Sequence, residues 1–227
     1  MFLVYLSRIL IVVVFAYYVY ITKIKAKKFL SKYIISIKEK DYFQAAEYLE
    51  QFNKEEAHSE AIVLQSYLSI MFENGDEIKS IMKLYPRKKL ETPESLSYAI
   101  VCLLNNESEK AKSIISQLKL SEKILHRRWG HVFNGQALCA YHALENTINK
   151  NWEKAAYYFG QHKKNDHWED ESEAPGLWAL WDYIDCCIAE GLGYQAHLQE
   201  ISQKYQQDMK GKQVPKLIQR FERWEIS

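Results

Sequence analysis

The sequence predicts an all-α protein, a right-handed α-solenoid of about five helical hairpins between an N-terminal transmembrane helix and a C-terminal capping helix. Apolar residues recur at steps of three and four from residue 61 to residue 188, and no period-two alternation appears. Turn residues interrupt this pattern about every 30 to 45 positions, the spacing of helical repeats. Only 8 glycines and 4 prolines occur in 227 residues. A β-sandwich that turns about every 8–12 residues would need more of both.

Residues 2–21, FLVYLSRILIVVVFAYYVYI, contain a single charged residue, Arg8. About 20 apolar residues are enough to cross a bilayer as a helix. Arg8 lies near one end of the stretch, where it can reach the interface, and three tyrosines lie near the other end, at headgroup level. We therefore expect residues 1–22 to form a transmembrane anchor. A cleaved signal peptide is the alternative, but its positive charges would precede the apolar stretch.

A group of lysines follows the apolar stretch and predicts its orientation: Lys23, Lys25, Lys27, Lys28 and Lys32. Basic residues beside a span stay on the cytoplasmic side, and they attract an anionic leaflet. We expect residues 23–40 to be a basic juxtamembrane helix that merges into the first repeat. The rest of the chain would then be cytoplasmic at the cell membrane. An exported domain tethered outside the cell is the alternative that this lysine placement disfavours.

Two similar sequence motifs occur in the expected repeat domain, residues 41–212. DYFQAAEYL covers residues 41–49 and NWEKAAYYF covers residues 151–159, with a double alanine at the same offset. A small residue there lets the second helix of a hairpin pack closely against the first. We expect such close crossings at four alanines: Ala45, Ala111, Ala155 and Ala196. In the second hairpin, Lys79 takes the place of the alanine.

These features resemble tetratricopeptide repeats over roughly residues 24–205. In that family a bulky residue follows the small one by four positions, which Leu49, Ile115 and Phe159 match and Glu200 does not. Ala99 and Ala143 match the small residue of the first helix. The proline that closes each repeat in the family is missing. The resemblance implies a non-catalytic scaffold whose first helices line a concave groove for a partner peptide or helix.

The C-terminal segment, residues 213–227, is predicted to form an amphipathic capping helix. Its apolar residues fall on one helical face: Val214, Leu217, Ile218, Phe221 and Trp224. A cap is needed because the last hairpin of a repeat array has no neighbour.

The four cysteines are Cys102, Cys139, Cys186 and Cys187, and they form no CxxC pair and no metal-ligand spacing. We expect reduced thiols in packed helices, which favours a reducing compartment. The sequence also lacks the motifs of common enzyme classes: no P-loop, GxGxxG, GxSxG or HExxH occurs. We therefore predict no catalytic residue and no cofactor. The formal net charge of +1 gives no support for nucleic-acid binding.

The stretch HKKNDHWEDESE is the most site-like part of the sequence. It offers possible metal ligands at His162, Asp166, His167, Glu169 and Asp170. These residues lack the fixed spacing on one helical face that a zinc site needs. They also lie just before Pro175, where a loop between hairpins is expected. We therefore predict a solvated acidic loop and no metal site.

Two groups of residues are candidates for partner binding. Arg127, Arg128 and Trp129 in HRRWGH suit an acidic peptide or a phosphate, although a connector packed on the repeats would use the same residues. Trp178 and Asp185 lie along the first helix of the fifth hairpin. Trp181 is in phase with the apolar residues of that helix and is expected in the core. Trp178 is out of phase and is the better candidate for the groove.

The functional expectation is a single-pass membrane protein whose cytoplasmic repeat domain binds a protein partner and catalyses no reaction. An all-helical enzyme, with a site assembled from dispersed His and acidic residues, is an alternative from another class. A composition rich in Lys, Ile and Tyr is typical of a low-GC bacterium. No residue pattern in the sequence identifies the partner.

Overall fold

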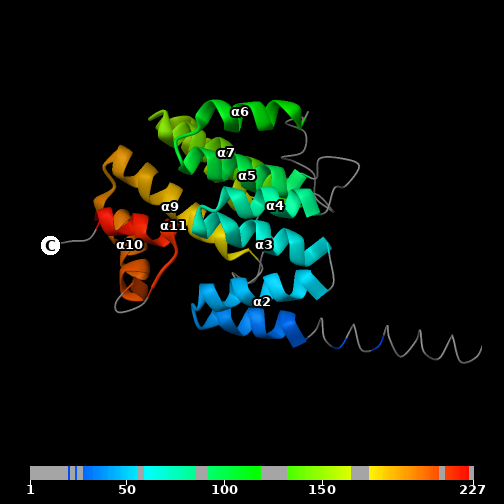
Figure 1. Cartoon of the computed structure of the whole chain (residues 1–227). Helices are drawn as coiled ribbons and strands as arrows, with labels where there is room; N and C mark the ends of the chain where they lie inside the picture. The colour runs from blue at the N-terminus through cyan, green and yellow to red at the C-terminus, as the bar shows by residue number, and fades with distance from the viewer. Residues whose placement is uncertain are drawn as a thin grey trace, which may run out of the picture. The chain divides into compact units, whose positions relative to one another are not determined.

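The computed structural model describes residues 28–55, 59–84, 92–118, 132–164, 174–209 and 213–224, together with Tyr20 and Ile24. Within these ranges the chain is helical apart from short turns, and it contains no strand (Figure 1). The all-α prediction is therefore confirmed. The expected anchor, residues 1–22, lies outside the described residues except for Tyr20. None of the helices within the described ranges combines the length and the apolarity that crossing a bilayer requires.

Consecutive helices form hairpins. The first hairpin pairs a helix over residues 28–38 with α2. The remaining helices follow in chain order: α2 (Tyr42–Glu55), α3 (Ser59–Phe72), α4 (Gly75–Leu84), α5 (Thr92–Leu104), α6 (Ser108–Gln117), α7 (Val132–Ile148), α8 (Trp152–Lys164), α9 (Pro175–Leu192), α10 (Gln195–Met209), α11 (Lys216–Gln219) and the 3-10 helix η3 (Arg220–Trp224). The chain divides into two compact units, residues 1–61 and residues 62–227.

The same turn joins the two helices of each described hairpin. One residue in each turn has a left-handed conformation, with φ between 53° and 80°: Lys40, Glu73, Asn106, Lys150 and Gly193. Its backbone N–H donates to the carbonyl three residues earlier, and the next N–H donates to the carbonyl five residues before it. This is the Schellman arrangement that satisfies the last carbonyls of a helix. The hairpins are therefore repeats of one local structure.

The turn fixes which residue of each second helix faces its hairpin partner. The fifth residue after the left-handed one is buried in all five cases: Ala45, Ile78, Ala111, Ala155 and Leu198. The predictions for Lys79 and Ala196 were therefore wrong, since Ile78 and Leu198 take these positions and Ala196 is exposed. Gly191 lies inside α9, so the fifth turn begins only at Gly193.

The first unit is held together by apolar side chains of the helix over residues 28–38 and α2. Its buried residues come from both helices: Tyr33, Ile37, Ala45, Leu49 and Phe52. Lys28 and Lys32 are exposed, and the Lys32 Nζ lies 5.0 Å from the centroid of the Tyr48 ring. Lys23, Lys25 and Lys27 lie outside the described residues.

In the second unit the first helices of the hairpins form the core. Helices α5, α7 and α9 contact one another in series, whereas α4 packs on α5, and α8 packs on both α7 and α9. The first helices are buried on nearly every face, and in α9 only Trp178, Asp182 and Asp185 are partly exposed between Ala174 and Ala189. The resemblance implied an open groove along the first helices, but their burial leaves little of that surface accessible.

Gly176 brings the start of α9 against α3. A Cβ atom at this position would lie 1.8 Å from the Tyr67 carbonyl oxygen, so the two backbones touch where no side chain fits. The close approach ties the fifth hairpin directly to the second.

The C-terminal segment is shorter and less regular than the predicted helix over residues 213–227. It consists of α11 followed by η3, and residues 225–227 lie outside the described part. Four of the five apolar side chains of the predicted face are nevertheless buried, and Val214 is half-buried: the buried ones are Leu217, Ile218, Phe221 and Trp224. The Phe221 ring stacks on Tyr205 of α10 at 4.0 Å between centroids, so the segment covers α9 and α10.

All four cysteines are buried in the first helices and form no disulfide. Burial raises the pKa of the Cys102 and Cys187 thiols to about 11 and that of Cys139 to about 12. Because a thiolate is the reactive form, these thiols are unreactive at neutral pH.

Candidate functional site

The most distinctive polar arrangement among the described residues surrounds Tyr98. Tyr98 is partly exposed, although the residues beside it in α5 are buried. Its ring points outward between α4 and α6. Gly75 begins α4, and a Cβ there would lie 3.1 Å from Tyr98 Cε2, so the absence of a side chain gives the ring room. The hairpin geometry thus places one aromatic ring between two second helices.

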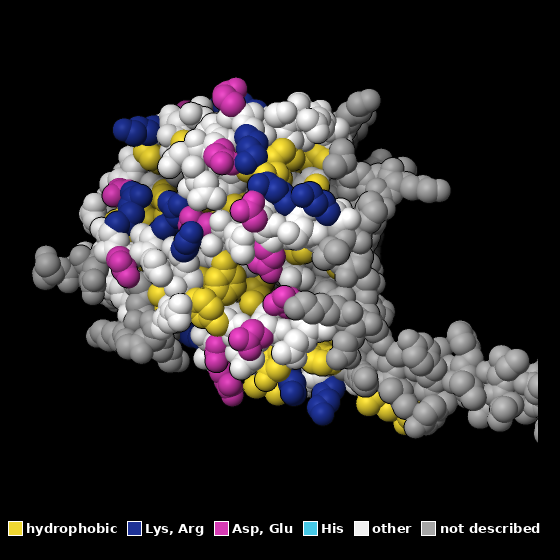
Figure 2. All heavy atoms as spheres, in the orientation of Figure 1, with side chains coloured by type: hydrophobic (Ala, Val, Ile, Leu, Met, Phe, Trp, Pro, Cys, Tyr) yellow, Lys and Arg dark blue, Asp and Glu magenta, His cyan; other side chains and the backbone are white. Residues whose placement is uncertain are grey.

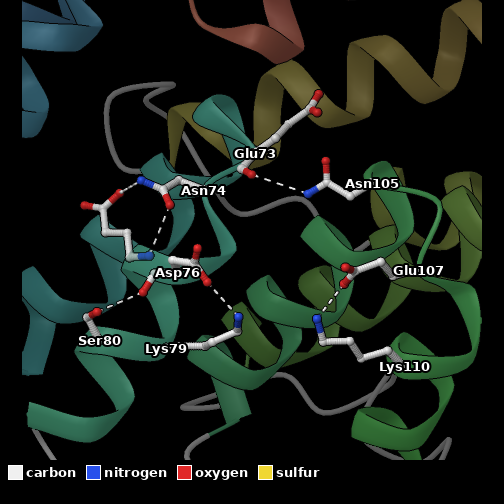
Figure 3. Close-up of polar contacts among 9 residues, drawn as sticks. Glu73, Asn74, Asp76, Lys79, Ser80, Asn105, Glu107 and Lys110 are labelled. Carbon is white, nitrogen blue, oxygen red and sulfur yellow. Dashed lines mark hydrogen bonds and ion pairs between the residues drawn. The ribbon is translucent and has the colours of Figure 1, made fainter.

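Two lysines, one from each second helix, reach this ring. Lys79 Nζ lies 5.4 Å and Lys110 Nζ lies 5.3 Å from the Tyr98 ring centroid. Each ammonium is also paired with a carboxylate three residues earlier: Lys79 with Asp76 of α4 at 2.7 Å, and Lys110 with Glu107, the residue before α6, at 2.6 Å (Figure 3). We call these five residues the Tyr98 cluster. In this cluster the two lysines place positive charges near the phenol ring, and the two carboxylates pair with them.

The hydrogen bonds of the cluster shift the proton affinities of its members. The pKa of Lys79 is raised by its hydrogen bond to Asp76 and then by one to Tyr98. The pKa of Lys110 is raised in the same way by Glu107 and Tyr98. Hydrogen bonds from the lysines lower the pKa of Asp76 and Glu107. All four charges are therefore present at neutral pH.

A polar network joins the turns beside the cluster. The Asn74 side-chain oxygen accepts from the Glu77 backbone N–H at 3.1 Å and so caps α4. Asn105 donates its amide to the Glu73 carbonyl oxygen at 3.4 Å, which links the second turn to the third (Figure 3). The second of these bonds joins the turn before α4 to the turn after α5.

The surface around the cluster carries both signs of charge. Figure 2 shows Lys or Arg and Asp or Glu side chains interspersed over the face formed by α4 to α6. A mixed-charge face of this kind supports oriented contact with a complementary surface.

Histidines form separate pairs elsewhere. His142 of α7 stacks on Tyr158 at 5.0 Å between centroids and lies 3.6 Å from Glu145. His197 of α10 lies 3.1 Å from Asp185 of α9. No group of three or more His, Cys, Asp and Glu residues with a geometry suited to a metal ion occurs in the described ranges.

The sequence-predicted partner residues fall into different environments. Trp178 is partly exposed on α9, whereas Trp181 is only 3 % exposed and lies edge-on to Phe159 at 5.5 Å. Asp185 bonds His197 and so belongs to the contact between α9 and α10. Arg127, Arg128 and Trp129 lie outside the described residues. So do the side chains of the possible metal ligands: His162, Asp166, His167, Glu169 and Asp170.

The members of the Tyr98 cluster were not among the sequence-predicted site residues. Acid–lysine pairs three residues apart, Asp76 with Lys79 and Glu107 with Lys110, were visible in the sequence, but such pairs are common on helix surfaces. The informative feature was Tyr98, a polar-tipped residue in an apolar first helix. Its surroundings could not be predicted from the sequence because they depend on how α4, α5 and α6 pack together.

A comparison of this chain with protein-family models, curated proteins and solved structures finds no match.

Proposed function

We propose that this protein is a membrane-anchored, non-catalytic scaffold whose cytoplasmic helical-repeat domain binds a protein partner. The observation that carries the proposal is the fivefold use of one hairpin turn, which sets five helix pairs in equivalent local geometry. Helical repeats of this type act by shape, since rigid helices present side chains over an extended surface. We further propose that the hairpins stack as a tetratricopeptide-like right-handed solenoid, in keeping with the serial contacts of α5, α7 and α9.

The proposed partner site is the outer face of α4 and α6 around the Tyr98 cluster. The first helices are largely buried, so the second helices offer more accessible surface. Lys79, Lys110 and Tyr98 are at least partly exposed there, and each lysine is paired with a nearby carboxylate. An aromatic ring flanked by charged groups suits a protein interface, where a few such residues supply most of the binding energy.

The proposed location follows from the N-terminal sequence. Residues 1–22 would anchor the chain, and the lysines behind them would hold the domain on the cytoplasmic side. The exposed side chains of Lys28 and Lys32 could then meet an anionic leaflet. Labelling of a cysteine placed at exposed Gln203, with an impermeant reagent on intact cells, tests this orientation. Labelling before the cells are opened would contradict it.

Site-specific photo-crosslinking in native membranes tests the partner proposal. A photoreactive residue is placed at Ser80 of α4 or Ser113 of α6, both exposed on the proposed face, and at exposed Gln203 of α10 as a control. We expect a discrete protein adduct from the first two positions and none from the control. If none of the three positions gives an adduct, the scaffold proposal fails. If Gln203 alone gives one, the proposed face is wrong.

A further inference from the structure

The second hairpin turn contains an Asn-Gly dipeptide, Asn74–Gly75, where α4 begins. Asn74 is exposed and follows the left-handed residue Glu73. Its backbone N–H donates to the Ser69 carbonyl oxygen at 3.1 Å, and its own carbonyl oxygen accepts from the Ile78 N–H at 3.5 Å. Asn74 is therefore the N-cap of α4, a position at which the backbone is not helical.

An asparagine that precedes a glycine can cyclise to a succinimide. The glycine nitrogen attacks the side-chain Cγ of asparagine, a C–N bond forms, and the side-chain amide leaves as ammonia. The proton lost by the glycine nitrogen balances the proton that ammonia gains. Water then opens the ring at either carbonyl and yields aspartate or isoaspartate. Glycine favours the reaction because it has no side chain to obstruct the attack.

Two features of the turn promote this attack at Asn74. The nitrogen of Gly75 belongs to the first residue of α4, whose N–H has no partner within its own helix. The Asn74 Oδ1 accepts from the Glu77 backbone N–H at 3.1 Å (Figure 3). A donor therefore already faces the oxygen on which negative charge develops during the attack, at the positive end of the helix dipole.

Packing explains why glycine occupies the second position of the dipeptide. A Cβ at Gly75 would lie 3.1 Å from Tyr98 Cε2, which is closer than an ordinary van der Waals contact. The placement of the Tyr98 ring between α4 and α6 therefore disfavours any larger residue there. The reactive dipeptide is thus retained by the fold.

We infer that Asn74 is a site of spontaneous deamidation in the folded protein. Aspartate at this position keeps the cap of α4, because Asp and Asn are about equally good N-caps. Isoaspartate lengthens the main chain by one methylene and shortens the side chain, so that α4 loses its cap. Either product adds a negative charge beside Glu73, Asp76 and Glu77. The inference does not depend on the proposed scaffold function.

The chain contains matched controls for this site. Asn134–Gly135 is the same dipeptide, but both residues lie inside α7, where the backbone is helical. Asn151 occupies the same position in the fourth turn and is exposed like Asn74, but the residue after it is Trp152. The first control keeps the dipeptide and changes the backbone conformation. The second keeps the turn and changes the following residue.

Peptide mapping by mass spectrometry measures the products at each asparagine after incubation of the full chain in detergent at mildly alkaline pH. We expect Asn74 to react at least about tenfold faster than Asn134 or Asn151, a difference of about 1.4 kcal/mol in activation free energy. In urea, which unfolds both the turn and α7, Asn74 and Asn134 should react at similar rates. The fold would then account for the selection between two identical dipeptides.

Either of two results would overturn the inference. In one, Asn74 reacts no faster than Asn151 in the folded chain. In the other, Asn134 reacts there as fast as Asn74. The loss of the cap is tested on the isoaspartate form, separated by chromatography. We expect its thermal midpoint to be lower than that of the Asn74→Asp variant, which represents the aspartate product. Equal midpoints would contradict the loss of the cap.

Discussion

Arg220 forms a bidentate ion pair with Glu73, which lies 147 residues earlier in the chain. Arg220 Nε lies 2.5 Å from Glu73 Oε1, and Nη2 lies 3.0 Å from Oε2. The same Nη2 donates to the Leu104 carbonyl oxygen at 2.7 Å at the end of α5. The Glu73 side chain is only 6% exposed. One arginine therefore joins the second turn, the third hairpin and the C-terminal segment.

Removal of Arg220 should strongly destabilise the protein. Arg220→Ala would leave the Glu73 carboxylate buried without a counter-charge, which typically costs about 3–5 kcal/mol. The free energy of unfolding, measured in urea, should fall by a value of that order. Arg223→Ala is the control, since the Arg223–Glu190 pair is about half exposed and should contribute less than about 1 kcal/mol. A double change, Glu73→Leu with Arg220→Met, should recover much of the loss. Equal effects of Arg220→Ala and Arg223→Ala would contradict this account.

The repeat register makes opposite predictions for two alanines. Ala155 is fully buried, so Ala155→Leu should overpack the contact between α7 and α8 by about 1–3 kcal/mol. Ala196 is exposed, so Ala196→Leu should change stability by less than about 0.5 kcal/mol. Thermal unfolding of both variants measures the difference, and Lys154→Leu serves as the exposed control on α8. Greater destabilisation by Ala196→Leu would show that the fifth hairpin has a different register.

The turn residues with a left-handed conformation predict where a change to glycine should stabilise the folded protein. Lys150 has φ 56°, a conformation that costs a side-chain-bearing residue about 1 kcal/mol relative to glycine. Lys150→Gly should therefore raise the free energy of unfolding by up to about 1 kcal/mol. Gly193, with φ 80°, should respond in the opposite sense, so that Gly193→Ala lowers stability by about 1 kcal/mol. Changes of the same sign in both variants would argue against equivalent turns.

Trp178 and Trp181 should differ in their effect on stability. Trp181 is buried against Phe159, so Trp181→Ala should cost about 3–5 kcal/mol. Trp178 is partly exposed, and Trp178→Ala should cost less. Urea unfolding of the two variants makes the comparison. A groove at α9 is an alternative to the proposed partner site on α4 and α6: if the groove is used, Trp178→Ala weakens partner crosslinking while the helices remain intact. If Trp178→Ala were the more destabilising change, the phase of α9 would be wrong.

The buried thiols predict a loss of stability at high pH. The folded-state pKa of Cys102 and Cys187 is about 11 and that of Cys139 is about 12, against an ordinary value of 9.0. Each raised pKa means that the folded state holds its proton more tightly than the unfolded chain. The contribution is fully present below pH 9 and is lost as pH rises through 11 to 12. Urea unfolding from pH 8 upward should show this decline, and it should be smaller in Cys139→Ala.

Local sequence patterns predicted the helices and hairpins because helical periodicity and turn residues act over a few positions. The same reasoning identified the small residue at the helix crossing in three of the second helices: Ala45, Ala111 and Ala155. The fifth was misplaced because Gly191 and Gly193 both looked like turn glycines, whereas Gly191 lies inside α9, where a Cβ would come within 2.4 Å of the Trp152 ring. The C-terminal segment changes from α-helix to 3-10 helix where Arg220 and Phe221 meet distant partners. The Tyr98 cluster likewise joins three helices, and no local pattern specifies that meeting.

The contact between Gly176 and Tyr67 limits how this family of hairpins could have diversified. In an open repeat array, each repeat touches only its neighbours, so gene duplication can add or delete a repeat without disturbing the others. Here the start of the fifth hairpin rests on the backbone of the second, with no room for even a methyl group. A duplicated hairpin between them would separate these two surfaces. This contact therefore fixes the number of hairpins between the second and the fifth.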